Sequence, residues 1–405
     1  MAYNIQEAKE LVVEAGKKLL ETGLIARTWG NVSARISDTQ FVITPSGRAY
    51  ETLTPDDIVV VNIADCSYEG DIKPSSEKGV HADAYRLRPE ENFVIHTHQI
   101  KASVVGATGL NIEAIPEKYA TLFGDCVPVA DYGMPSTSKL RNAVAKAYEE
   151  YPNSKAILMK QHGAVVTGKS FEEAFEVVSE LENLCEEKIQ KAYQVYEGTA
   201  NYSRTAMFNS YIKAVGTGKM PKAIADFGES ARIGSKFEIH FKNGNSFTVD
   251  IKTGKSTSDV KLPAAALVHS EIYKHSDVDY IKHLTASEII AVSIAQKEIN
   301  PRLDDFAQIA GTKIGSFRWD GSRASGKAAA KALNGNNAVL IAGAGAGALC
   351  TGTKLSDLDA VELIMSRECQ TIIGSVFYGA GDTLSAVDAN IMRFIYKTKY
   401  SKKAD

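Results

Sequence analysis

The chain has 405 residues, which is enough for two domains that each bury a hydrophobic core. Its 46 Lys and Arg residues nearly balance its 49 Asp and Glu residues, with no basic block or acidic tail, so we expect no nucleic-acid partner. No apolar run approaches about 18 residues, the five cysteines are widely spaced, and the first residues do not resemble a signal peptide. A cytoplasmic protein without a membrane partner is therefore expected.

Helical and strand-like segments alternate along the first half of the chain. Apolar side chains at helical spacing, among them Leu11 and Leu19, predict a helix over residues 5–22. Further helices are expected at 76–88, 137–151 and 170–197. Short strands separated by Pro and Gly turns are expected at 32–36, 41–44 and 57–62. Helices that pack on such a strand-rich layer form an α/β or α+β domain.

Two more strands of this half are each expected to end at histidine. In His96-Thr97-His98, which follows an apolar run, both imidazoles point to the same side of a strand and can reach one ion. His162 also follows an apolar run. A His-x-His pair alone is a weak sign of a metal site, but three imidazoles with an open fourth position are typical of catalytic zinc. Glu77, in a Ser-Ser-Glu motif, is a candidate base beside the metal.

The second half of the chain repeats the first. The matching segments, in order, are His81 with His269, 85–96 with 273–283, 118–124 with 305–311, 163–168 with 347–352, and Cys185 with Cys369. The offset stays between 184 and 188 residues, which indicates a tandem duplication with a boundary between about 205 and 230. We therefore predict one domain over residues 1–215 and a second over residues 225–405.

The second copy lacks the predicted catalytic chemistry, and we expect it to be silent. Residues 74–77, Pro-Ser-Ser-Glu, are matched by residues 263–266, Pro-Ala-Ala-Ala. The histidines correspond as His96 to His283, His98 to Thr285 and His162 to Ala346. The glycine-rich segment 339–347 resembles the start of a dinucleotide-binding turn, but its glycines alternate and it occupies the place of the His162 strand. No nucleotide site is predicted there.

Five motifs in the first half occur in a characteristic order. They are Trp-Gly-Asn-Val-Ser at 29–33, Ile-Thr-Pro-Ser-Gly at 43–47, Pro-Ser-Ser-Glu at 74–77, His-Thr-His at 96–98 and Gln-His-Gly at 161–163. Over roughly residues 5–195 the chain thereby resembles the class II aldolase/adducin family, and within it the L-fuculose-1-phosphate aldolase-like enzymes. The resemblance implies a three-layer α/β/α fold with a mostly antiparallel central sheet, present here as two tandem copies.

The resemblance assigns a metal and a base. It implies that His96, His98 and His162 hold one Zn²⁺ per chain, although the residues do not distinguish zinc from another divalent ion. As a Lewis acid, the ion would stabilise the enediolate formed when a carbon–carbon bond breaks. Glu77 would exchange the carbon-bound proton of that enediolate. The alternative role of Glu77 is purely structural, as a carboxylate at the positive end of a helix dipole.

A phosphate-binding cradle is also implied by the resemblance. Its residues would be Thr28, Asn31, Ser46, Gly47, Ser75 and Ser76. Hydroxyl groups, a side-chain amide and backbone N–H groups at turns or at a helix N-terminus all donate toward an anion. The same residue types also form turns and helix caps, and one residue can do both.

The implied reaction is reversible cleavage of a ketose 1-phosphate of the fuculose, rhamnulose or ribulose type into dihydroxyacetone phosphate and a short aldehyde. Glu77 and the Gln-His-Gly motif favour the aldolases, whereas the motifs at 29–33 and 96–98 also occur in ribulose-5-phosphate 4-epimerases. A methylthioribulose-1-phosphate dehydratase is a further alternative. A non-enzymatic, adducin-like scaffold is a fourth, although the intact set of metal ligands argues against it.

A second proton donor is expected to be a tyrosine from a neighbouring subunit. Tyr119 is the predicted residue, and its repeat partner Phe306 has no hydroxyl group. Because family members usually form rings of four, two tandem chains could form a homodimer that is a pseudo-tetrameric ring. If the copies alternate in that ring, the donor must come from elsewhere. Other candidates are Tyr132, Tyr396 and Tyr400.

Overall fold

The computed structural model describes residues 2–25, 29–216, 218–258, 260–342 and 346–400. By contacts the chain divides into two compact units. Unit 1 contains Met1–Tyr196, Gly374–Asp382 and Ile395–Asp405, and unit 2 contains Glu197–Ile373 and Thr383–Phe394. The bounds expected from sequence, 1–215 and 225–405, stay a prediction, and the contacts assign two C-terminal segments to unit 1.

Unit 1 is built on a seven-stranded sheet in the order β3-β2-β1-β4-β9-β8-β7. Its strands are β1 (Asn31–Arg35), β2 (Gln40–Ile43), β3 (Val59–Asn62), β4 (Phe93–Thr97), β7 (Val129–Ala130), β8 (Ala156–Met159) and β9 (Gly163–Gly168). All neighbours are antiparallel except β7 and β8. A separate two-stranded sheet joins β5 (Ile112–Glu113) to β6 (Cys126–Val127). The mostly antiparallel sheet is as predicted.

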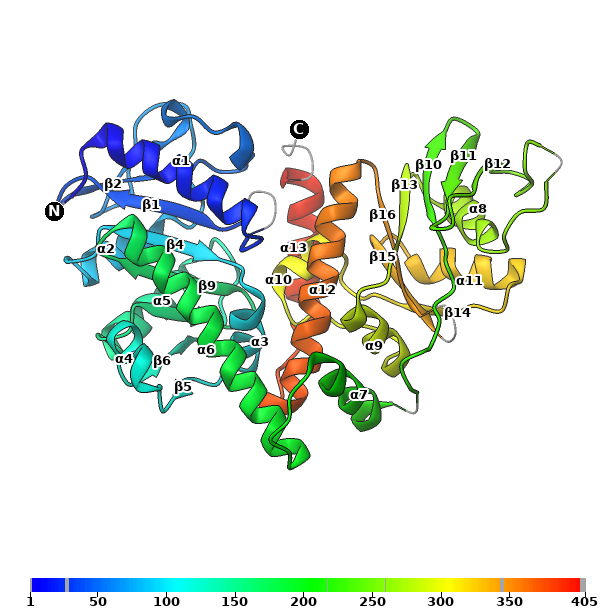
Figure 1. Cartoon of the computed structure of the whole chain (residues 1–405). Coiled ribbons are helices and arrows are strands. Elements are labelled where there is room, and N and C mark those ends of the chain that lie inside the picture. Colours follow the sequence, from blue (N-terminus) through cyan, green and yellow to red (C-terminus); the bar gives the residue numbers. More distant parts are fainter. Residues whose placement is uncertain (1, 26–28, 217, 259, 343–345, 401–405) are drawn as a thin grey trace. The chain divides into compact units, whose positions relative to one another are not determined.

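Helices cover both faces of this sheet, as a three-layer fold requires (Figure 1). They are α1 (Ile5–Glu21), α2 (Lys78–Leu87), α3 (Ile100–Thr108), α4 (Glu117–Phe123), α5 (Ser138–Glu150) and α6 (Phe171–Glu197), with short helices at Tyr50–Thr52 and Pro55–Asp57. Tyr85 of α2 and Tyr148 of α5 are buried in one core cluster with Val94. The neighbouring side chain Phe93 points to the other face and packs on Phe171 of α6.

Unit 2 has a seven-stranded sheet with the same strand order, β12-β11-β10-β13-β16-β15-β14. Its strands are β10 (Glu229–Ile233), β11 (Lys236–His240), β12 (Ser246–Asp250), β13 (Tyr280–Leu284), β14 (Ser316–Arg318), β15 (Ala338–Ala342) and β16 (Gly347–Gly352). Its helical segments are α7 (Arg204–Val215), α8 (Ala266–His275), α9 (Ser287–Ala295), α10 (Asp304–Ile309), α11 (Arg323–Leu333), α12 (Leu355–Tyr378) and α13 (Ala386–Ile395), and α12 continues into unit 1. A π-helix at Tyr396–Tyr400 belongs to unit 1.

A buried hydrogen-bond motif confirms the duplication in atomic detail. In unit 1, Ser33 Oγ lies 2.6 Å from His81 Nδ1 and 2.8 Å from the Tyr85 hydroxyl. In unit 2, Ser230 Oγ lies 2.7 Å from His269 Nδ1 and 2.8 Å from the hydroxyl of Tyr273, the repeat partner of Tyr85. Equal topology with equal internal hydrogen bonds shows that the halves are two copies of one domain.

The predicted elements of the first copy exist, with shifted ends. The strand predicted at 57–62 begins at Val59 because Pro55–Asp57 forms a 3₁₀ turn, and the helix predicted at 76–88 spans Lys78–Leu87. The alignment of the second copy needs a correction by one residue. Glu77 and Ala265 are both N-cap residues of equivalent helices, so Ala265, rather than Ala266, stands where the first copy has Glu77.

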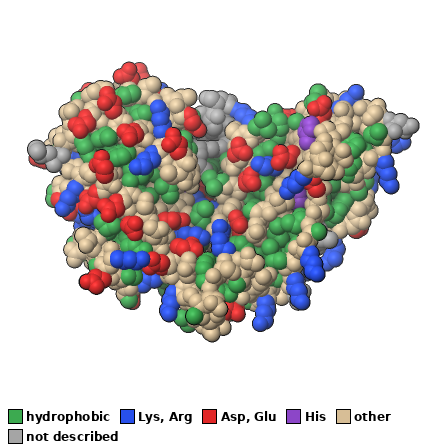
Figure 2. Space-filling model, in the orientation of Figure 1, with side chains coloured by type: hydrophobic (Ala, Val, Ile, Leu, Met, Phe, Trp, Pro, Cys, Tyr) green, Lys and Arg blue, Asp and Glu red, His purple; other side chains and the backbone are tan. Residues whose placement is uncertain are grey.

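The surface and the helices agree with the bulk composition. Basic and acidic side chains are interspersed on the face seen in Figure 2, as a net charge of −3 suggests. In the part of the chain that the structure describes, no helix is both long and apolar enough to cross a membrane. All five cysteines are free thiols.

Candidate metal centre

The structure brings His96, His98 and His162 together in the interior of unit 1. One ring nitrogen from each lies within 4.8 Å of the others, and the three side chains are at most 6% exposed. Their ring centroids are 4.7 to 5.0 Å apart. Buried imidazoles this close together can coordinate one ion, because zinc and similar cations bind neutral imidazole nitrogens. The donor set therefore fits a divalent transition-metal ion.

Strand pairing and a tight turn position these ligands. His96 lies on β4 and His98 directly follows that strand, whereas His162 lies in the turn between β8 and β9. The prediction that His162 ends a strand was therefore wrong, since β8 ends three residues earlier. Gly163 permits the close approach, because a Cβ atom there would lie 2.3 Å from the Thr97 carbonyl oxygen.

The turn that carries His162 is also fixed from outside the sheet. Gln161 has a left-handed backbone, with φ of 63°. Its side-chain amide donates to the Asp382 carbonyl oxygen at 2.8 Å, and Lys160 pairs with the Asp382 carboxylate at 3.1 Å. These contacts, which sequence reasoning missed, anchor a turn whose conformation is otherwise unfavourable for a residue with a side chain.

Glu77 projects its carboxylate between two of the histidines. Oε2 lies 2.7 Å from His96 Nδ1, and Oε1 lies 3.2 Å from His162 Nε2. Burial alone would raise the pKa of the Glu77 carboxyl, but the neighbouring His96 and His162 lower that pKa well below its usual range. The group is therefore an ionised carboxylate at neutral pH. It can serve as a proton acceptor or as a further ligand to an ion.

Asn31 and His81 hold the Glu77 carboxylate in place. The Asn31 amide nitrogen donates to Glu77 Oε2 at 3.2 Å, and its oxygen accepts a hydrogen bond from His81 Nε2. His81 is fully buried, and burial lowers its pKa to about 3, so the ring is neutral. Its Nδ1 accepts from the Ser33 hydroxyl. This chain of hydrogen bonds fixes the orientation of the amide that faces Glu77.

The described residues of the predicted phosphate cradle lie at the same end of the sheet as the histidines, with mixed exposure. Ser75 is buried; its hydroxyl accepts from the Glu77 backbone N–H at 3.2 Å, and its own N–H donates to Thr44. Ser46 and Gly47 are half-buried, and Ser76 is exposed with its hydroxyl 2.7 Å from Ser136. The Asn31 side-chain amide donates a hydrogen bond to the Glu77 carboxylate in this structure. Thr28 lies outside the described residues.

A family model described as the class II aldolase and adducin N-terminal domain matches residues 10–189 and 237–368. The chain belongs to the class II aldolase/adducin family. The two matched segments fall in the two copies, in agreement with the duplication seen in the sheets. Members named aldolases are among the relatives, and the chain is a class II aldolase, an enzyme of a metal-dependent class.

Two curated relatives match about half of this class II aldolase. The 5-deoxy-D-ribulose 1-phosphate aldolase of Bacillus thuringiensis serovar kurstaki is 33% identical over 180 residues, 44% of this chain and 82% of the relative. The 5-methylthioribulose-1-phosphate/5-deoxyribulose-1-phosphate aldolase of Escherichia coli O45:K1 is 35% identical over 177 residues, 44% of this chain and 81% of the relative. A solved L-fuculose 1-phosphate aldolase is 30% identical, with a TM-score of 0.42 over 48% of this chain and 88% of that chain.

The second copy retains the frame of the aldolase site without its ligands. His283 is buried and its Nδ1 accepts the Phe227 backbone N–H at 3.4 Å. Thr285, Ala346 and Ala265 occupy the remaining positions. Among the described residues, the cluster in unit 1 is the only group of three His, Cys, Asp or Glu side chains arranged to hold an ion. Residues 343–345, in the glycine-rich segment, lie outside the described part.

The predicted proton donor Tyr119 does not meet the histidines within its own chain. It is 2% exposed, and its hydroxyl donates to Glu187 of α6 at 2.9 Å. Tyr396 is buried in unit 1, with its ring 6.4 Å from that of Trp29 in the first motif, and Tyr132 is half-buried. The side chain of Tyr400 is not described. A role for Tyr119 in another subunit stays a prediction.

Replacing His81 by leucine tests the positioning of Glu77. The variant should lose about 10- to 100-fold in kcat, the usual effect of removing a partner of a metal-site group, while KM and metal content change little. The repeat offers a matched control. His269→Leu removes the equivalent hydrogen bond to Ser230, so both variants should lose stability by about 1–3 kcal/mol in chemical unfolding. An equal loss of kcat in both variants would show that His81 acts only on stability.

Proposed function

We propose that this enzyme is a zinc-dependent aldolase that cleaves a ribulose 1-phosphate-type ketose reversibly into dihydroxyacetone phosphate and a short aldehyde. The observation that carries the proposal is the buried triad His96, His98 and His162 with the Glu77 carboxylate set between two of its rings. The names of the two curated relatives support a substrate whose tail is a methyl or methylthio group, in place of the longer tail of a fuculose phosphate.

The residues of the site match the steps of this reaction. Zn²⁺ held by the three histidines would supply Lewis-acid stabilisation of negative charge on the substrate oxygens. In the direction of synthesis, the Glu77 carboxylate removes a proton from the hydroxyl-bearing carbon of dihydroxyacetone phosphate. That carbon then forms a bond to the aldehyde carbon, and the aldehyde oxygen takes up a proton from the second donor, for which Tyr119 of another subunit is proposed. Asn31 keeps the carboxylate directed at the substrate throughout.

The phosphate group is assigned to the loops that precede Glu77. Ser75 and Ser76 lie at the start of α2, where backbone N–H groups point out of the helix, and Ser46 and Gly47 belong to the adjoining turn. The Ser46 N–H donates to Lys73, and the Ser75 N–H donates to Thr44, which ties these two segments together at 2.9 and 3.0 Å. These backbone hydrogen bonds would hold the proposed cradle together before a ligand binds.

Product analysis tests the proposal. We expect the zinc-loaded protein to condense dihydroxyacetone phosphate with acetaldehyde or methylthioacetaldehyde to a five-carbon ketose 1-phosphate or its methylthio analogue. Mass spectrometry identifies the new carbon–carbon bond. Epimerisation of ribulose 5-phosphate without such a bond would assign the chain to the epimerase reaction instead. Failure of both reactions with the metal-loaded protein would contradict the enzyme proposal.

The oligomer is a second part of the proposal, motivated by the duplication. A homodimer of tandem chains would present four copies of one domain, as a pseudo-tetrameric ring, and could bring a tyrosine of one chain to the site of the other. We expect light scattering to give twice the chain mass of 43.8 kDa. A monomer, or a ring of four chains, would contradict this arrangement.

A further inference from the structure

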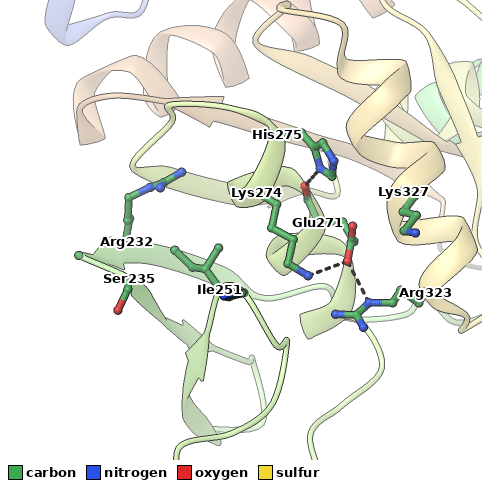
Figure 3. A pocket seen from close by; sticks show the side chains of 10 residues that line it. Arg232, Ser235, Ile251, Glu271, Lys274, His275, Arg323 and Lys327 are labelled. Carbon is green, nitrogen blue, oxygen red and sulfur yellow. Dashed lines mark hydrogen bonds and ion pairs between the residues drawn. The ribbon is translucent and has the colours of Figure 1, made fainter.

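A hollow of about 590 Å³ on unit 2 is lined mainly by basic side chains. The turn between β10 and β11, the end of β12, the C-terminal end of α8 and the start of α11 surround it. Its charged residues are Arg232, Lys252, Lys274, Arg323, Lys327 and Glu271. Figure 3 labels these charged side chains except Lys252, with Glu271 between Lys274 and Arg323. The lining residues thus include five cations and one carboxylate.

The Glu271 carboxylate forms ion pairs with two of the cations, and the other cations remain able to bind a ligand. Glu271, 2% exposed, accepts from Lys274 at 2.9 Å and from Arg323 at 3.0 Å. The Arg323 guanidinium also donates to the Thr253 carbonyl. Among the described residues, the exposed Lys252 and Lys327 form no ion pair within 4 Å, although the pKa of the Asp250 carboxyl is lowered by hydrogen bonds from Thr253 and also by nearby Lys252. The five cations still outnumber the carboxylates that interact with them, which are Glu271, Asp279 and Asp250.

Arg232 is fixed in advance by the backbone. Its guanidinium donates to three carbonyl oxygens, those of Tyr273, Ser276 and Val278, at 2.8 to 2.9 Å, with Asp279 at 3.8 Å. A guanidinium held in this way loses little conformational entropy when an anion binds beside it.

Comparison of the two copies shows which part of this charge is particular to the second one. Three of its five cations have basic equivalents in the first copy, where Arg35, Arg86 and Arg141 stand for Arg232, Lys274 and Arg323. Three pairs of residues are structurally equivalent. Tyr85 and Tyr273 make the same hydrogen bond to a serine. Val61 and Val249 have the same strand register, and Arg141 and Arg323 bind equivalent carboxylates. By these equivalences the first copy has alanine at two positions where the second has lysine: Ala64 for Lys252 and Ala145 for Lys327. The copy without metal ligands therefore carries additional basic groups at another place in its fold.

We propose that this hollow binds a small phosphorylated sugar or polyol. Arginine forks and lysine ammonium groups together are the usual partners of phosphate oxygens. The volume lies within the range of small-molecule sites, roughly 300–1,000 Å³, and exceeds what a lone phosphate ion fills. Among the described residues that line the hollow there is no phenyl, phenol or indole ring, and Ile251 is the one large apolar side chain, which disfavours a nucleobase. The overall charge of −3 disfavours nucleic acid.

Calorimetric titration with glucose 6-phosphate tests the proposal, with glucose as the uncharged counterpart. The full-length protein should bind glucose 6-phosphate with a Kd below about 1 mM, and the double variant Lys252→Ala/Lys327→Ala should weaken that binding at least tenfold. Lys261→Ala/Lys331→Ala removes two exposed lysines of the same unit that do not line the hollow, and it should leave the Kd within twofold. Both variants keep the catalytic copy intact, so its own phosphate cradle contributes equally to both titrations.

Equal isotherms for the two double variants would overturn the proposal, and so would binding of glucose as tight as that of its phosphate. Absence of saturable binding to the wild-type protein would also overturn it. All four lysines are exposed, so thermal unfolding midpoints should agree among the variants and confirm that each is folded. Because the titration uses no aldolase substrate, its outcome is independent of the proposed reaction.

Discussion

Replacement of Glu77 by glutamine is expected to lower aldol cleavage by about 10²- to 10⁴-fold, the usual contribution of a positioned base. Glutamine keeps the volume of the side chain but cannot accept the substrate proton at neutral pH. Glu77 makes no side-chain cap hydrogen bond to α2, so the helix should begin at the same residue in the variant. The rate of dihydroxyacetone phosphate release, measured at saturating substrate, checks this expectation.

The metal content of the Glu77→Gln protein distinguishes the base from a structural ligand. We expect close to the wild-type amount of bound ion, because the three histidines remain. A variant that loses the ion together with its activity would mean that Glu77 acts as an indispensable ligand. Activity within a few-fold of wild type would contradict its role as the base.

Replacement of His96 by alanine is expected to abolish metal binding, and replacement of His283 is expected to leave it unchanged. The two histidines occupy the same position of equivalent strands, β4 and β13, and both are buried. His96 makes ring contacts with His98 and His162, whereas the ring contact of His283 is with Phe227. Activity should fall at least about 10²-fold in His96→Ala, since stabilisation of the developing oxyanion is lost.

His283→Ala provides the control for general damage. Loss of the contact to the Phe227 N–H should cost about 1–3 kcal/mol of unfolding free energy, without loss of metal or activity. Elemental analysis of both purified variants measures the effect. Substantial loss of metal from His283→Ala would show that the second copy takes part in the centre, and a silent second copy would then be ruled out.

The spacing of apolar residues along the chain was sufficient to predict most helices and strands of the first copy. The spacing of His96 and His98 was sufficient to predict one pair of metal ligands. The helices at 5–22 and 170–197 were expected from apolar spacing and are present as α1 and α6. His96 and His98 could be joined from sequence alone, because side chains two apart at the end of a strand point the same way. The correspondence of His81 with His269 was likewise visible in the sequence, but the sequence did not indicate the hydrogen bonds that these histidines make.

Long-range pairing explains what sequence reasoning missed. Asn31 reaches Glu77 and His96 only because β1 pairs with β4 in the register that sets Asn31 opposite His96. No spacing within the chain indicates that register. His81 lies one helical turn after Glu77, which places both on one face of α2, but its bond to Asn31 depends on the same strand pairing.

The turn at His162 depends on contacts of the same kind. Its left-handed residue Gln161 is held by Asp382, which lies 221 residues further along the chain. An apolar run followed by histidine is compatible with the end of a strand or with a hairpin turn. Because β8 pairs antiparallel with β9, His162 lies in the turn between them. Alignment of Pro74 with Pro263 set Glu77 opposite Ala266, one residue too far along the chain. The structure sets Glu77 opposite Ala265, because these two residues are the N-caps of equivalent helices.

We propose that one copy holds a working metal centre and that the other keeps the frame of the site without its metal ligands. The most direct test is the metal content of the purified wild-type chain after incubation with zinc and removal of excess ion, with both metal and protein measured in absolute amounts. One ion per chain of 43.8 kDa is predicted, because only the first copy has three histidine ligands. Two tightly bound ions per chain, or none, would contradict the claim.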